Sequence, residues 1–251
     1  MSNLKNYINE SSIKSRNNSK EQFLFGSIPI YIKPELFFLD GESNIGQVID
    51  IVQKNIPPHL SSNIDVIYVG DFQEFQEKRF NAAYEDGAIY VINVQDNAKD
   101  MADDIIHEIA HSLEEKYANH IYGDGRLQNE FLGKRERLYQ ILKANNENSQ
   151  EYKNLFHDLD YDAKFDDYLV NQVGYKKLAN YINGLFYSPY AATSVREYFA
   201  RGFEAYFLFK DQKYLANISP ILYNKIETLA DMEWKWLTLA FLRQKTGTFA
   251  P

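Results

Sequence analysis

The sequence predicts an α+β fold, in which a small mixed sheet packs on helices and is followed by a mostly helical second half. Short runs rich in β-branched and aromatic residues, which are typical of strands, occur only before residue 97. Beyond that point apolar residues recur at helical spacing in longer segments, and no internal repeat is visible. We therefore expect a cleft where the two halves of the chain meet.

The elements of the first half have recognisable boundaries. The polar residues 1–22, rich in Asn, Ser and Lys, are typical of a flexible arm. Pro57-Pro58 ends a helical pattern, and Asp86-Gly87 predicts a turn. In order, the pattern predicts a strand within 23–36, a helix over about 45–52, strands at 64–72 and 88–93, and a helix over about 97–115.

The second half is predicted to be helical. Residues 119–180 are charged, with a polar break at 145–149, and we interpret this stretch as an insertion. After a loop at 187–190, helices are expected over about 195–209, 217–230 and 231–244. The predicted organisation is an arm (1–22) and a single domain (23–251), made of an N-lobe (about 23–118), the insertion (about 119–180) and a helical C-lobe (about 181–251).

Composition limits the classes of function. The chain has 251 residues, of which 45% are apolar, with 17 Phe and 19 Tyr, so a sizeable core is available. The formal charge is −8 and no basic stripe is present, which argues against nucleic acid as a partner. There are no cysteines, so any metal must be held by His, Asp or Glu.

The chain also has no pattern of membrane insertion. No apolar run reaches transmembrane length, and the first residues lack the apolar segment of a signal peptide. We therefore expect a cytoplasmic protein without a membrane partner. This expectation leaves open export by a route that uses no signal peptide.

The strongest motif is His107-Glu108-Ile109-Ala110-His111. Residues four apart lie on one face of a helix, so His107 and His111 can direct their imidazoles at one ion. Glu108 lies at the edge of that face, where a carboxylate can take a proton from water. The alternative is a chance pair of helical histidines. The apolar neighbours of the motif favour a buried helix beneath a cleft, and thus a site for one Zn²⁺ ion.

The third ligand is less certain, because the next histidine of the longer HExxHxxGxxH motif is missing. Two glutamates compete. Glu130 follows His111 at a spacing seen in some zinc peptidases, but its neighbours, Lys134 and Arg135 among them, are typical of a solvated charged helix. Glu197 lies on a helix with an apolar stripe, which suits a metal ligand. It also completes a capping box with Ser194, and the spacing alone leaves both readings open.

The segment EYFARGFEAYF, residues 197–207, and the later residues 218–223 resemble the end of the catalytic domain of the anthrax lethal factor family. That family includes the clostridial Pro-Pro endopeptidases. The similarity runs from about residue 64 to 226, interrupted by the predicted insertion. It implies a zincin-like fold of the gluzincin type, with His107, His111 and Glu197 as ligands and Glu108 as the catalytic base. It also implies that Tyr190, seven residues before Glu197, assists catalysis.

One residue departs from the pattern of this family. Where the family commonly has a second glutamate, this chain has Arg201. A carboxylate that orients the ligands is then either missing or supplied by Glu204 or Asp104.

These features predict a zinc-dependent endopeptidase. Glu108 takes the proton of the attacking water and passes it to the leaving amine, while Tyr190 stabilises the oxyanion. We expect an extended peptide or protein substrate to pair with an edge strand at 88–92. The alternative is a weakly active or inactive interaction protein on the same fold, suggested by Arg201, the insertion and the aromatic segment 234–242.

Overall fold

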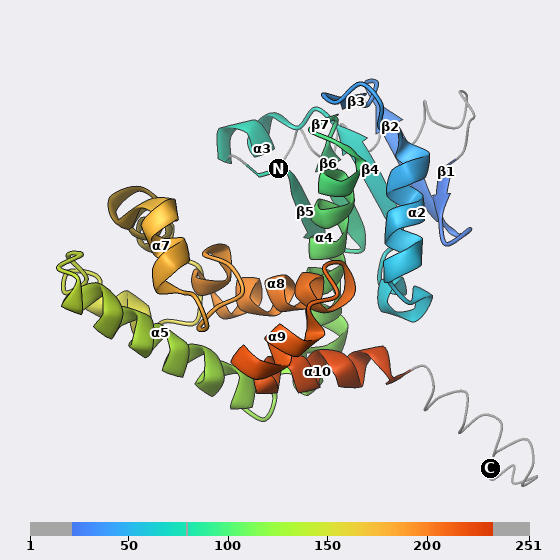
Figure 1. The fold of residues 1–251 in the computed structure, drawn as a ribbon. Coiled ribbons are helices and arrows are strands. Elements are labelled where there is room, and N and C mark those ends of the chain that lie inside the picture. Colours follow the sequence, from blue (N-terminus) through green and yellow to red (C-terminus); the bar gives the residue numbers. More distant parts are fainter. Residues whose placement is uncertain (1–21, 79, 233–251) are drawn as a thin grey trace, which may run out of the picture. The chain divides into compact units, whose positions relative to one another are not determined.

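The computed structural model describes residues 22–78 and 80–232 (Figure 1). Apart from Gln22, the predicted arm lies outside these residues, as do the aromatic segment 234–242 and nearly all of the predicted helix 231–244. The described chain forms two compact units. The first contains the residues up to Ala118 together with 207–209, and the second contains the remaining residues from Asn119 onward. The predicted α+β class is confirmed.

The first unit is built on a five-stranded mixed sheet with the strand order β1-β2-β4-β6-β5. Strand β4 pairs in parallel with β2 and β6, whereas β1 and β5 are antiparallel to their neighbours. A separate parallel pair joins β3 to β7. The bounds are β1 Gln22–Leu24, β2 Ile28–Lys33, β3 Phe37–Phe38, β4 Val66–Gly70, β5 Ala82–Glu85, β6 Ala88–Ile92 and β7 Val94–Gln95.

The strand predicted at 88–92 is present, but the prediction that it lies at the edge of the sheet is wrong. This segment is β6, and it lies between β4 and β5, so both of its edges are already paired. The strand missed by sequence reasoning is β5, which joins β6 through a tight turn at Asp86 and Gly87. Both turn residues have positive φ, 48° and 82°, as a two-residue hairpin connection requires.

Side chains on the two faces of the sheet differ in character. Ile67, Val69, Ile89 and Val91 are fully buried and share one face, because residues two apart in a strand point the same way. On the opposite face Tyr31, Tyr68 and Tyr90 stack with ring centroids 5.8 and 5.5 Å apart, and Phe72 and Phe75 complete this cluster. Helices α2 (Ile45–Asn55) and α4 (Ala98–Tyr122) run alongside the sheet (Figure 1). Two short elements, η1 (Pro58–Ser61) and α3 (Gln73–Lys78), complete the unit.

Helix α4 carries the predicted metal motif. Its start is stabilised by Asn97, whose side-chain oxygen accepts hydrogen bonds from the backbone N–H groups of Lys99 and Asp100. The helix continues beyond the predicted end at 115, with a non-helical backbone at Tyr117 (φ −114°, ψ 20°). One of its faces is apolar and fully or almost fully buried, which holds the helix in the core of the unit: Met101, Ala102, Ile105, Ile106, Ile109 and Leu113.

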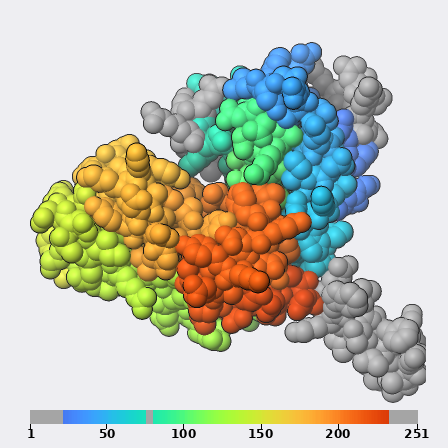
Figure 2. Space-filling view, in the orientation of Figure 1, coloured from blue at the N-terminus to red at the C-terminus, as the bar shows by residue number. Residues whose placement is uncertain are grey.

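The second unit is helical, as expected. The polar break at 145–149 does separate helices, and the predicted helix over 217–230 is two helices that meet at Ser219 and Pro220. Figure 2 shows the residues of these last two helices lying against each other. The elements are α5 Arg126–Ala144, η2 Lys153–His157, α6 Ala163–Asp167, η3 Tyr168–Gly174, α7 Tyr175–Tyr181, η4 Tyr190–Ala192, α8 Val195–Phe207, α9 Gln212–Ile218 and α10 Pro220–Ala230.

Helix α5 corrects the prediction of a solvated charged helix. Lys134 is buried and donates hydrogen bonds to the carbonyl oxygens of Leu185 and Ile218. Arg135 is only 1% exposed, and its guanidinium lies 4.1 Å from the centre of the Phe165 ring. A cation can be buried in this way when carbonyl oxygens and aromatic faces surround it. Lys134 and Arg135 therefore belong to the core of the second unit, whereas Arg126, Arg137 and Lys143 of the same helix are exposed.

Within the described part of the chain, no helix combines the length and apolarity needed to cross a membrane.

Candidate metal centre

The two histidines of the motif lie on one face of α4, as their spacing predicts. Their Nε2 atoms are 3.1 Å apart, and the two rings are nearly perpendicular, at 77°. Ligand atoms about 2.0–2.1 Å from a tetrahedral zinc ion lie about 3.3 Å from one another. The separation of the two nitrogens is therefore close to the separation that a shared ion requires.

Glu114 orients the second histidine. Its carboxylate oxygen Oε2 lies 2.7 Å from Nδ1 of His111, and the Glu114 side chain is only 7% exposed. A carboxylate at this position favours the proton on Nδ1, which leaves the lone pair of Nε2 directed toward a metal. Sequence reasoning looked for such a carboxylate at Glu204 or Asp104. The signal was the spacing of three residues after His111, which places Glu114 on the same face of the helix.

Acidic residues surround the motif on α4. Glu108 is 7% exposed, so its carboxylate is largely removed from bulk water. One turn earlier, burial raises the pKa of Asp104, and the nearby charge of Asp103 adds to this effect, so that the pKa reaches about 7. The charge of His107 acts in the opposite direction on this pKa. The charges of the motif therefore act on Asp104. The hydrogen bond to the ligand His111, however, is made by Glu114.

Glu197 lies in the first turn of α8. Its backbone N–H donates to the hydroxyl oxygen of Ser194 at 3.1 Å, which is the first half of the predicted capping box. The negative charge of Glu197 contributes to the raised pKa values of Tyr161 and Asp166, although burial is the main cause for both. Tyr161 donates a hydrogen bond to Asp166 at 3.0 Å. Neither residue was singled out from the sequence, because nothing in their spacing relates them to Glu197.

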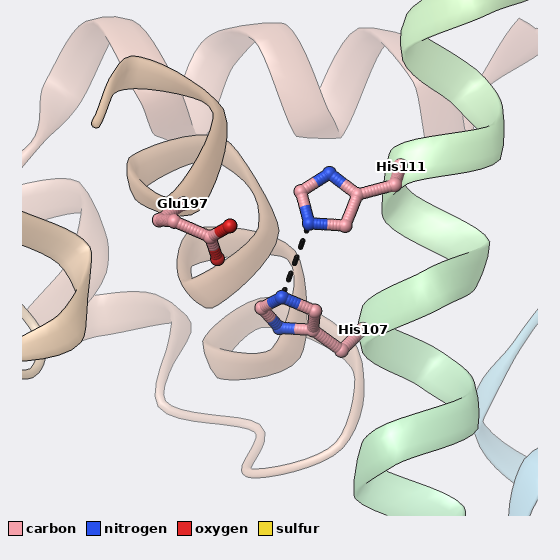
Figure 3. A group of neighbouring side chains, drawn as sticks. All are labelled: His107, His111 and Glu197. Carbon is pink, nitrogen blue, oxygen red and sulfur yellow. Dashed lines mark hydrogen bonds between the residues drawn. The ribbon is translucent and has the colours of Figure 1, made fainter. Parts of the chain in front are cut away.

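His107, His111 and Glu197 form a group that could hold a metal ion. One ligand atom from each residue lies within 4.8 Å of the others. Figure 3 shows the two imidazoles on α4 and the carboxylate on α8 directed toward one another. Two neutral imidazoles and one carboxylate are a donor set typical of catalytic zinc, which uses three protein ligands.

The competing glutamate, Glu130, has another role. Its two carboxylate oxygens accept the backbone N–H groups of Ile221 and Leu222 at 2.9 and 3.1 Å, and the hydroxyl of Tyr198 at 2.9 Å. These amides open helix α10, where the first N–H groups lack partners within the helix. Glu130 thus caps α10 and is not the solvated side chain that its charged neighbours suggested.

The remaining predicted residues lie on α8 or just before it. Tyr190 opens the short helix η4, and its carbonyl oxygen accepts hydrogen bonds from the backbone N–H and hydroxyl of Thr193. Its role in catalysis stays a prediction. Glu204 is fully buried and pairs with Arg201, with 2.6 Å between Oε2 and Nη1. The carboxylate of Glu204, which was expected to orient the ligands, is therefore engaged by Arg201.

Comparison of the chain with models of protein families, with curated proteins and with solved structures finds no significant match.

Proposed function

We propose that this chain is a zinc-dependent endopeptidase whose metal ligands are His107, His111 and Glu197. The observation that supports it best is the 3.1 Å separation of the two Nε2 atoms on α4, together with a carboxylate in the same group. Glu114 supports the assignment further, because it leaves the Nε2 lone pair of His111 for a metal. A chance pair of helical histidines has no need of such a partner.

The chemistry follows from the residues beside the ligands. When bound, a zinc ion supplies Lewis acidity, which lowers the pKa of a water molecule and polarises a carbonyl group. Glu108 accepts a proton from the attacking water and delivers it to the leaving amine. Its burial strengthens these interactions, because the surroundings of the carboxylate screen charge less than water does.

The resemblance to the anthrax lethal factor family supports the remaining assignments. It makes Tyr190 the donor to the oxyanion and a peptide or protein the substrate. Because β6 is paired on both sides, an extended peptide would instead add to β5, the outermost strand at that end of the sheet in the described chain. The backbone groups of β5 that point away from β6 offer the hydrogen bonds that such a peptide needs.

The test is cleavage of a mixed peptide library by the wild-type chain and by Glu108→Ala. We expect cleavage that requires zinc and falls by at least about 100-fold in the variant, because the general base is lost. Glu115→Ala is a matched control, since Glu115 is on the same helix but accepts hydrogen bonds from Tyr84 and Asn63. If no peptide is cut in a Glu108-dependent way, the chain is better described as a binding protein on this fold.

A further inference from the structure

The segment that leads into α8, residues 188–193, is a compact turn. The backbone N–H groups of Ala192 and Thr193 donate to the carbonyl oxygens of Pro189 and Tyr190 at 3.1 and 3.0 Å. Ala191 and Ala192 are fully buried, so the turn is packed into the second unit. Its conformation sets where Tyr190 lies and how the first turn of α8 begins.

Arg135 contacts this turn on the side that follows Tyr190. Its Nη1 atom donates to the carbonyl oxygens of Ala192 at 2.8 Å and Thr193 at 3.1 Å, and Nη2 donates to that of Leu155. Burial lowers the pKa of the guanidinium to about 9. The planar fork of arginine suits this task, because its several N–H donors have fixed directions.

Arg201 contacts the turn on the side that precedes Tyr190. Its Nε atom donates to the hydroxyl oxygen of Ser188 at 3.3 Å, and the same oxygen accepts the backbone N–H of Ala191 at 3.3 Å. The ion pair with the fully buried Glu204 fixes the Arg201 side chain. A carboxylate buried this deeply requires a cationic partner, so the pair holds Arg201 in one orientation.

We propose that Arg135 and Arg201 are positioning residues that hold the turn 188–193 from its two sides and thereby place Tyr190 for catalysis. The inference rests on the proposed peptidase function for its kinetic consequences. It gives a role to Arg201: its guanidinium donates a hydrogen bond to Ser188. A glutamate at this position could not donate such a bond, because an ionised carboxylate only accepts hydrogen bonds. The arginines act through Tyr190, and neither is placed among the metal ligands.

The kinetic test is a double-mutant cycle. The variant Arg201→Gln/Glu204→Gln removes the cation without leaving a buried carboxylate unpaired. We expect kcat to fall about 10- to 100-fold, because small displacements of a catalytic group have effects of this size. KM and zinc affinity should stay within about twofold of the wild-type values, since the variant alters only transition-state contacts. In a Tyr190→Phe background the same change should cost less than about twofold, because both act on one interaction.

Lys134→Met is the matched control. It also removes a buried cation that binds two carbonyl oxygens in the second unit, but those carbonyls belong to Leu185 and Ile218. We expect its kcat to be unchanged. Equal losses of kcat in Lys134→Met and in the Arg201 variant would overturn the inference, as would an undiminished effect of the Arg201 variant in the Tyr190→Phe background.

Hydrogen exchange separates this inference from the proposed function. The amides of Ala191, Ala192 and Thr193 should exchange at least about tenfold faster in the Arg201→Gln/Glu204→Gln variant, because the turn opens more readily. They should be unaffected in Lys134→Met. Unchanged exchange at these amides in the Arg201 variant contradicts the positioning role even if the peptidase is active. Absence of Glu108-dependent cleavage in the wild type contradicts the proposed function instead.

Discussion

At the scale of single residues, the candidate centre depends on carboxylates with distinct partners. Glu114 forms a hydrogen bond with His111, and Glu130 accepts hydrogen bonds from the first amides of α10. Glu204 forms an ion pair with Arg201. Glu114 and Glu204 each lie three residues from their partner, whereas the partners of Glu130 come from distant segments that its sequence position does not reveal. What distinguishes Glu197 is the proximity of its carboxylate to the two imidazoles.

The role of Glu114 is testable through metal affinity. Glu114→Gln should weaken zinc binding by about 10- to 100-fold, because His111 loses the carboxylate that fixes its tautomer and orientation. The measurement is a zinc titration against a competing chelator. Glu115→Gln, one residue further along α4, should leave the affinity unchanged. Equal affinities for Glu114→Gln and the wild type would show that Glu114 does not support the ligand.

The role of Glu130 is testable through stability. Glu130→Ala should lower the free energy of unfolding by about 1–3 kcal/mol, because two helix amides and a tyrosine hydroxyl lose their acceptor. Denaturant titration measures this change. The partly exposed Glu136 on the same helix is the control, and its replacement by Ala should change stability by less than about 0.5 kcal/mol. A stable Glu130→Ala variant would contradict the capping role.

At the scale of elements, helices α8 and α10 are packed closely at a glycine. A Cβ atom added at Gly202 would lie 2.4 Å from Cδ2 of Leu222, which is closer than van der Waals contact permits. The absence of a side chain therefore lets the helix that carries Glu197 approach α10. By contrast, a Cβ atom at Gly133 of α5 meets nothing within 4 Å.

Replacing these two glycines by alanine should change the free energy of unfolding in opposite directions. Gly202→Ala should destabilise the protein by about 1–3 kcal/mol through overpacking. Gly133→Ala should stabilise it by about 0.5–1 kcal/mol, because alanine is the better helix former. Thermal or denaturant unfolding of both variants measures the contrast. Stabilisation by both substitutions would show that α8 and α10 are not in close contact at this point.

The elements that sequence patterns predicted are those with strong periodicity. β4, β6 and α4 were found because their apolar residues recur with the period of a strand or a helix. Strand β5 was missed because Ala82, Ala83 and Glu85 have weak strand preferences, and it forms by pairing with β6 across the turn. Because β5 was missed, β6 was taken for the edge strand, whereas β5 is the outermost strand at that end of the sheet.

At the scale of the whole molecule, buried cations shape how the second unit responds to pH. Burial lowers the pKa of Lys134 to about 8, from the usual lysine value of 10.5. Below pH 8 both folded and unfolded chains carry this proton. Between about pH 8 and 10.5 only the unfolded chain keeps it, so raising the pH favours the folded state.

We therefore expect the wild type to gain stability relative to Lys134→Met as the pH rises from about 8 to 10.5. The gain has an upper bound of about 3 kcal/mol, which is the free energy equivalent to the shift in pKa. The experiment compares the unfolding free energies of the two proteins across this range. A constant difference would show that Lys134 titrates normally in the folded chain.

The candidate metal centre could be predicted from the sequence only in part. His107, Glu108 and His111 were predicted with their geometry, because one helical turn determines it. Glu197 is far from them in the sequence, and spacing alone could not choose between Glu197 and Glu130 as the third ligand. The buried roles of Lys134 and Arg135 were not predictable, because their carbonyl partners come from distant segments.

The most direct test of the central claim is the zinc content of the purified wild-type chain and of the Glu197→Ala and Glu130→Ala variants. We predict about one zinc ion per chain in the wild type and in Glu130→Ala, because three protein ligands are retained. Glu197→Ala should lose most of its zinc. Zinc retained in Glu197→Ala but lost in Glu130→Ala would contradict the assignment of the third ligand.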